Sequence, residues 1–199
     1  MRYKALMWLW VGLLLPLQLA WAELPVNPRL GGDFTLNSTL DRPLALKEFA
    51  GKVVLLNFGY TSCPDVCPMV VSRMSQVMKQ LGDKSDSVQP LFISFDGERD
   101  TVEKLRAYLN YFYPRFIGMT GNAEEIASVT KKYGAIYIKQ DQGSAGVFYS
   151  HSDYIYLIDK LGQVRALYAN DAKVEQIKTD IEELLAESPA AKSWWKGLW

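Results

Sequence analysis

The chain has 199 residues, of which 22 are basic and 22 are acidic, so its formal net charge at pH 7 is zero. Proteins that bind nucleic acid usually carry a clustered basic face, and this balanced composition gives no sign of one. The length suits one domain with a sizeable hydrophobic core. We therefore expect a single globular domain that does not bind nucleic acid.

The first 22 residues have the layout of a secretory signal peptide. Arg2 and Lys4 form a short basic region, an apolar stretch covers 5–15, and 20–22 read AWA, an A-x-A cleavage site. We therefore expect export, in a bacterial cell to the periplasm, with 23–187 as the folded domain. The alternative is an uncleaved anchor to the inner membrane, because the apolar stretch is near the lower length limit for a membrane span.

Beyond an extended N-terminal segment, strand patterns recur along the chain. Residues 34–39 predict a short edge strand. Continuous apolar runs over 52–60 and 88–95 are typical of strands that are covered on both faces of a sheet. A turn signal between 154–158 and 163–168 predicts an antiparallel hairpin.

Apolar residues at helical spacing and N-capping signals predict helices between and after these strands. The predicted helices cover 66–81, 100–112, 122–133 and 173–186. In the second of these, Asp100 and Glu103 resemble a capping box. Strands that alternate with helices predict a largely parallel sheet, to which the hairpin adds antiparallel strands. The expected fold class is therefore α/β, with a central mixed sheet flanked by helices and an N-terminal extension.

Soft metal ligands are scarce in this chain. Cys63 and Cys67 are the only cysteines, and His151 is the only histidine. The cysteines follow the first core strand and open the first helix, as in the thioredoxin-like plan. A helix N-terminus favours the thiolate form of Cys63. Four residues are about one helical turn, so both sulfurs can bind one ion or join each other.

Two thiolates and one imidazole suit copper better than magnesium or calcium. A structural zinc site would usually use four protein ligands, and the chain has no further cysteine or histidine. The alternatives remain open at this point. Cys63 and Cys67 could form a plain disulfide in an exported protein, although so small a loop is a poor staple. His151 could equally be an ordinary surface or core histidine.

Carboxylates near the cysteines are candidates for a supporting role. Asp65 lies between the two cysteines and could either tune them or cap the following helix. Asp96 and Glu98 follow the second core strand, where they could lie near the site or simply form a turn.

Several segments resemble the Sco/SenC family of copper-binding proteins. They read FGYTSCPDVCP at 58–68, SFDGERDT at 94–101, FIGMTG at 116–121, SHS at 150–152 and YLID at 156–159. The resemblance covers about 32–185. It implies a thioredoxin-like fold in which Cys63, Cys67 and His151 bind copper as Cu(I) and as Cu(II). It also implies a supporting role for Asp96.

The same resemblance implies work in the assembly of cytochrome c oxidase, by copper delivery to the CuA site of subunit II, by reduction of that site's cysteines, or by both. Our hypothesis is a metallochaperone for this or another exported copper protein, and not a classical enzyme. The alternative is a thiol–disulfide oxidoreductase that uses Cys63 and Cys67 as its redox pair. The C-x₃-C spacing and the absence of proline between Pro114 and Pro189 favour the metallochaperone.

The chain also departs from the family pattern. Ser62 stands where many members have histidine, Gly97 replaces a proline, and Ser150 replaces the aspartate before the histidine. The tail at 188–199 ends in SWWKGLW and lies outside the resemblance. It is expected to dock on the domain or to be disordered, and the alternatives are that it contacts the membrane or binds a partner.

Overall fold

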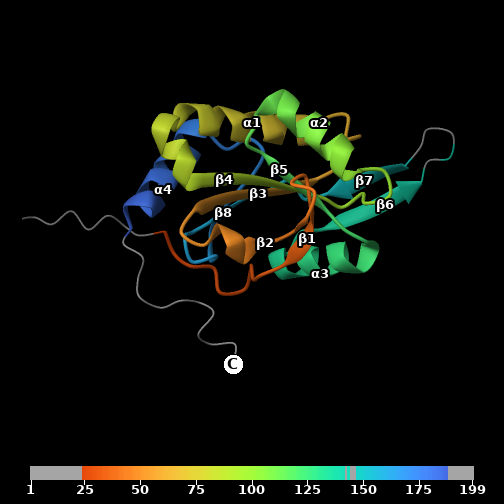
Figure 1. Cartoon of the computed structure of the whole chain (residues 1–199), viewed down its shortest axis with the longest axis horizontal. Coiled ribbons are helices and arrows are strands. Elements are labelled where there is room, and N and C mark those ends of the chain that lie inside the picture. Colours follow the sequence, from red (N-terminus) through yellow and green to blue (C-terminus); the bar gives the residue numbers. More distant parts are fainter. Residues whose placement is uncertain (1–23, 142, 144–146, 188–199) are drawn as a thin grey trace, which may run out of the picture.

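The computed structural model describes residues 24–141, 143 and 147–187. The predicted signal segment and the tryptophan-rich tail lie outside the described residues. Within the described part, a seven-stranded sheet lies between two helical layers, and a separate two-stranded hairpin extends beside it (Figure 1). No helix in these ranges is long and apolar enough to cross a membrane.

The large sheet has the order β2-β1-β5-β4-β3-β8-β9. Its strands are β1 (Thr35–Ser38), β2 (Pro43–Ala45), β3 (Val53–Gly59), β4 (Val88–Ser94), β5 (Ile117–Thr120), β8 (Ile155–Ile158) and β9 (Val164–Tyr168). The three central strands β3, β4 and β5 are parallel, and the outer strands run antiparallel to their neighbours. The separate hairpin pairs β6 (Tyr137–Asp141) with β7 (Val147–His151). The expected mixed sheet is therefore confirmed.

Four α-helices cover the two faces of the large sheet. They are α1 (Val66–Gln80), α2 (Val102–Phe112), α3 (Ala123–Tyr133) and α4 (Val174–Ala186). Two 3₁₀ segments, η1 (Leu46–Phe49) and η2 (Gly82–Ser87), complete the described elements. Helices α1, α2 and α4 pack on one face, and α3 packs with η1 on the other (Figure 1).

Strand β3, the first core strand, is covered on both faces. All seven residues of β3 are buried. Val53 and Leu55 contact the layer that contains α1, whereas Val54, Leu56 and Phe58 contact the layer that contains α3. Side chains alternate between the faces of a strand, so a strand covered on both sides needs apolar residues at every position. This strand places its carboxyl end, and hence the cysteine loop, at one edge of the molecule.

Several elements differ from the sequence predictions. The strand predicted at 34–39 is β1, but it is second in the sheet because β2 pairs outside it. Strands β2, β5, β6 and β7 were not predicted. β6 is mostly exposed and polar, so it lacks the apolar pattern that indicates a strand. As a result, His151 ends a strand and does not lie in a loop before β8.

The N-cap of α2 also differs from the sequence prediction. The N-cap is Thr101, whose hydroxyl accepts a hydrogen bond from the Lys104 amide, and not Asp100. Asp100 is completely buried and its carboxylate faces the cysteine loop. A carboxylate just before a helix is ambiguous in sequence, because capping and burial in a polar network use the same residue type.

Candidate metal centre

Three elements meet at the carboxyl end of β3. The loop after β3 carries Cys63, the first turn of α1 carries Cys67, and the end of β7 carries His151. The two sulfurs and one imidazole nitrogen all lie within 4.8 Å of one another. Two thiolates bound to one ion through bonds of about 2.3 Å can be at most about 4.6 Å apart. The separations in the cluster are therefore compatible with three ligands of one metal ion.

Gly59, the last residue of β3, makes room for the buried sulfur. A Cβ atom at this position would lie 2.9 Å from Cys67 Sγ and 2.9 Å from the ring of Phe92. Cys67 is 1% exposed and belongs to the apolar core, whereas Cys63 is only partly buried. The two cysteines are not joined by a disulfide in the structure. The pair thus offers one sulfur at the surface and one beneath it.

The pKa values of the two cysteines are shifted in opposite directions. A hydrogen bond from the Cys67 thiol lowers the pKa of Cys63 well below its ordinary value, and His151 and the Asp65 amide add to this effect against the cost of burial. The same hydrogen bond and burial raise the pKa of Cys67. The Cys67 amide, in the first turn of α1, donates to Cys63 Sγ at 3.5 Å. The site therefore combines a thiolate with a thiol at neutral pH.

His151 presents one ring nitrogen to the sulfurs. Its Nε2 lies 3.4 Å from Cys67 Sγ, and its Nδ1 lies 2.9 Å from the backbone carbonyl oxygen of Ser152. Because a carbonyl can only accept, Nδ1 carries a proton, and Nε2 is the ring nitrogen that could bind a metal after losing its own proton. Burial acts to lower the pKa of His151, but hydrogen bonds to Cys63 and Ser152 outweigh it and raise the pKa. The Ser152 carbonyl thus orients the ring without an aspartate at position 150.

Aromatic rings close the site on the side of the hairpin. The ring centroid of His151 lies 5.1 Å from that of Phe95 and 6.0 Å from that of Tyr60. Tyr149 packs on both of these rings, at 5.0 Å and 5.1 Å. These rings limit the access of water from this side, so charges within the site interact more strongly than they would in solvent.

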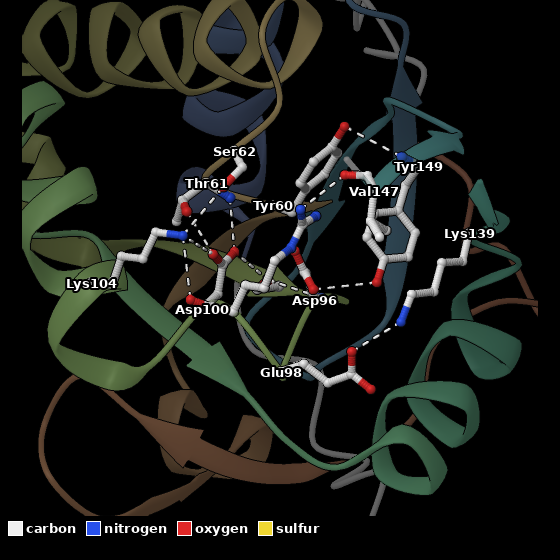
Figure 2. A network of polar contacts seen from close by, with 12 residues as sticks. Tyr60, Thr61, Ser62, Asp96, Glu98, Asp100, Lys104, Lys139, Val147 and Tyr149 are labelled. Atoms are coloured by element: carbon white, nitrogen blue, oxygen red, sulfur yellow. Dashed lines mark hydrogen bonds and ion pairs between the residues drawn. The ribbon is translucent and has the colours of Figure 1, made fainter. Parts of the chain in front are cut away.

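The supporting carboxylates take different places. Asp96 is 1% exposed but lies outside the ligand cluster, and it accepts hydrogen bonds from Arg99 and the Tyr149 hydroxyl (Figure 2). Asp65 is exposed and its side chain makes no capping hydrogen bond, so the capping interpretation is wrong. Its backbone amide, and not its carboxylate, faces Cys63.

Asp100 is a site residue whose role the sequence analysis missed. Its carboxylate accepts from the Thr61 amide at 2.7 Å, the Thr61 hydroxyl at 2.5 Å and the Ser94 hydroxyl at 2.7 Å. Lys104 Nζ lies 3.1 Å from this carboxylate and 3.2 Å from Ser62 Oγ (Figure 2). These contacts fasten the segment that leads into Cys63. The position of Asp100 between a buried strand and a helix was the available signal.

A cysteine pair at the start of the first helix of a thioredoxin-like sheet, faced by one histidine, defines a soft-metal or redox site. The SCO1/SenC family matches residues 22–186. The chain therefore belongs to the SCO1/SenC family.

Two relatives show the extent of the similarity. The SCO2-like protein of Rickettsia felis is 35% identical over 153 residues, which are 76% of this chain and 75% of that protein. The mitochondrial SCO2 homolog of Bos taurus is 38% identical over 78% of this chain and 59% of its own length.

Solved structures give the same result. ScoI of Bradyrhizobium japonicum with copper bound has a TM-score of 0.73 and 33% identity, and the match covers 78% of this chain and 99% of that one. ScoI of Arabidopsis thaliana with copper bound has a TM-score of 0.72 and 32% identity, with 77% and 97% covered. The thioredoxin-like fold class expected from the sequence is confirmed.

Proposed function

We propose that this chain is a copper metallochaperone that binds one copper ion, as Cu(I) or Cu(II), through Cys63, Cys67 and His151. The observation that carries the proposal is the clustering of these three donor atoms within 4.8 Å. The two copper-bound ScoI structures support it, because they share the fold and about a third of the sequence.

The donor set suits a metal that is carried and then released. Soft thiolates favour Cu(I), and an imidazole adds a ligand that Cu(II) accepts well. Cys63 is partly exposed, so a partner's ligand can approach the ion from the solvent side. Copper is thus the cargo of this site, and transfer would exchange the ligands of the chain for those of the recipient.

We further propose that the recipient is an exported copper protein in cytochrome c oxidase assembly, with the CuA site of subunit II as the first candidate. Membership of the SCO1/SenC family supports the link to this assembly. The proposed location is the bacterial periplasm, either free or attached to the inner membrane through residues 1–22. Delivery requires that copper arrive outside the cytoplasm, which is consistent with the signal-like N-terminus.

A second candidate is a thiol–disulfide oxidoreductase that prepares the copper-site cysteines of a partner. The lowered pKa of Cys63 and the nearby Cys67 thiol favour it. The Cys63 thiolate would attack a partner disulfide and release one partner thiolate. Cys67, after loss of its proton, would then displace the second partner sulfur and form the Cys63–Cys67 disulfide. The two electrons pass from this pair to the partner.

Copper titration of the reduced protein separates the two candidates. We expect one copper per chain, with thiolate-to-copper charge transfer in the Cu(II) form that is altered or lost in His151→Ala. His151→Ala should still form the Cys63–Cys67 disulfide, which makes it a control for an intact thiol pair. The metallochaperone is contradicted if the reduced protein binds no stoichiometric copper and instead exchanges readily with a disulfide substrate.

A further inference from the structure

The hairpin that carries His151 is attached to the domain mainly through side chains. Strands β6 and β7 form a sheet of their own and do not join the seven-stranded sheet. A cleft of about 350 Å³ lies against the hairpin, lined among others by Phe95, Tyr137 and Lys139. The position of His151 therefore depends on the side-chain contacts that hold β7 against the body.

Arg99 makes several of the polar contacts that span this junction, beside the bond from the Tyr149 amide to the Tyr60 hydroxyl and the exposed Lys139–Glu98 pair. Its Nη1 donates to the backbone carbonyl of Val147, the first residue of β7, at 2.9 Å. Its Nε donates to Asp96 Oδ2 at 2.5 Å, and Asp96 Oδ1 accepts from the Tyr149 hydroxyl at 3.3 Å. Figure 2 shows the Tyr149 hydroxyl meeting Asp96, with Val147 further along the same strand. One ion pair thus holds β7 at two points, two and four residues before His151.

The same guanidinium also lies between two aromatic rings. Its central carbon is 5.9 Å from the ring centroid of Tyr60 and 5.9 Å from that of Tyr149. These are cation–π distances, and Tyr60 comes from the end of β3 whereas Tyr149 comes from β7. A planar guanidinium can bind a carboxylate and a carbonyl while it stacks on rings, which a lysine ammonium cannot do.

The cysteine half of the site is held by a different residue. Asp100, the next residue in the chain, binds Thr61 through two hydrogen bonds and pairs with Lys104. Adjacent residues of one loop therefore make the main polar contacts to the two halves of the site, Asp100 to the cysteine loop and Arg99 to β7. A change at Arg99 should move the imidazole and leave the two sulfurs in place.

We propose that Arg99 is a positioning residue that fixes His151 at the copper site by fastening β7 to the loop after β4. The inference rests on the proposed function, since it assigns a role toward the copper ligands. It predicts that loss of Arg99 accelerates the release of Cu(II), whose binding needs the imidazole. The release of Cu(I), which the two thiolates bind, should change much less.

The test compares Arg99→Lys and Arg99→Met with Lys139→Met. Lys139 is the matched control, because it joins the same hairpin to Glu98 through an exposed ion pair, with side chains 48% and 79% exposed. Both Arg99 variants should shift the Cu(II) charge-transfer spectrum toward that of His151→Ala. Release of Cu(II) to a chelator should be about tenfold faster, as expected for loss of one charge-assisted hydrogen bond. Release of Cu(I) should stay within about threefold of wild type.

A second measurement needs no metal. In the metal-free protein, amide hydrogen exchange over Val147–His151 should be faster in both Arg99 variants, with exchange in β3 unchanged, and Lys139→Met should match wild type. If Arg99→Met fails to fold, Arg99→Lys, which keeps the charge, still gives both readings. Failure of wild type to bind copper would refute the proposed function, and the exchange experiment would still decide whether Arg99 holds the hairpin.

Three results would overturn the inference. One is wild-type exchange over β7 together with wild-type Cu(II) release in the Arg99 variants. Another is an equal acceleration of Cu(I) and Cu(II) release, which would indicate general damage to the site. The third is a Lys139→Met protein that behaves like the Arg99 variants.

Discussion

Cys63 and Cys67 carry the same side chain, and their surroundings assign them different chemistry. Cys63 is partly exposed and receives hydrogen bonds that favour its thiolate. Cys67 is buried, and its hydrogen bond to Cys63 raises its pKa, as does burial. Thiolates, and not thiols, attack electrophiles and bind metals. Cys63 is therefore the first sulfur to meet copper or a partner disulfide.

This difference predicts selective alkylation of the metal-free, reduced protein. An ordinary cysteine has a pKa of about 8.5, so at pH 6 little of it is thiolate. A lowered pKa keeps Cys63 reactive at pH 6, and its reactivity should disappear only as the pH falls through the lowered pKa. Mass spectrometry after brief iodoacetamide treatment should find the label on Cys63 and not on Cys67. The control Cys67→Ala removes the main hydrogen bond, so its Cys63 should react more slowly at pH 6. Equal labelling of both cysteines would contradict this assignment.

A second prediction at this scale concerns Asp100. Its buried carboxylate accepts hydrogen bonds from Thr61 and Ser94 and pairs with Lys104, and an amide cannot replace all of these contacts. We expect Asp100→Asn to lower the free energy of unfolding by about 1.5–3 kcal/mol, measured in urea. The control is Asp86→Asn. Asp86 pairs with Arg115 but is 84% exposed, so its loss should change stability by less than about 1 kcal/mol. Equal effects of the two substitutions would contradict the role given to Asp100.

At the scale of the element, β3 and α1 approach each other closely because β3 ends in glycine. Gly59→Ala would place a methyl group 2.9 Å from both Cys67 Sγ and the buried ring of Phe92. Such overpacking typically costs about 1–3 kcal/mol, and here the displaced atom is a metal ligand. We expect a lower midpoint of urea unfolding together with weaker copper binding. Wild-type copper affinity in Gly59→Ala would show that the close approach does not position the cysteine.

The elements that could be predicted from sequence are those with strong local patterns. The apolar runs of β3 and β4 and the capping box of α3, formed by Asn122 and Glu125, indicated their structures directly. β6 lacked such a signal, because its residues are mostly exposed and are ordered only through β7 and the side chains beneath it. The cysteines and His151 could be proposed as ligands because the chain has no further cysteine or histidine. The roles of Arg99 and Asp100 could not, since they depend on contacts between segments distant in sequence.

At the scale of the whole molecule, a buried ion cluster gathers the two ends of the described chain. Arg165, whose side chain is 7% exposed, pairs with Asp159 and Glu187. It also donates to the carbonyl oxygen of Leu24. Lys160 donates to the carbonyl oxygens of Leu185 and Glu187. The N-terminal segment, the β8–β9 turn and the end of α4 are thus held at one place.

This cluster predicts a large effect from a single substitution. Arg165→Met removes the cation and leaves Asp159 buried without its partner, which should lower the free energy of unfolding by about 3–5 kcal/mol. Arg42→Met is the control, since its ion pair with Glu48 is exposed and should contribute about 1 kcal/mol or less. Chemical denaturation measures both. Because the cluster is remote from the cysteines, folded Arg165→Met should retain wild-type copper stoichiometry, and loss of copper from folded protein would contradict this separation.

The position of the described chain ends also determines how far the copper site lies from them. Gly51, just before β3, binds Lys160 beside the cluster, and the cysteine loop follows the other end of the same strand. Figure 1 shows the described ends and the β6–β7 hairpin at opposite sides of the molecule. Seven strand residues span about 20 Å, so a tilt of about 30° about the ends would sweep the copper through about 10 Å. An attachment at the ends would thus act as a pivot, and the loaded site could search for a recipient's ligands while the domain stays rigid.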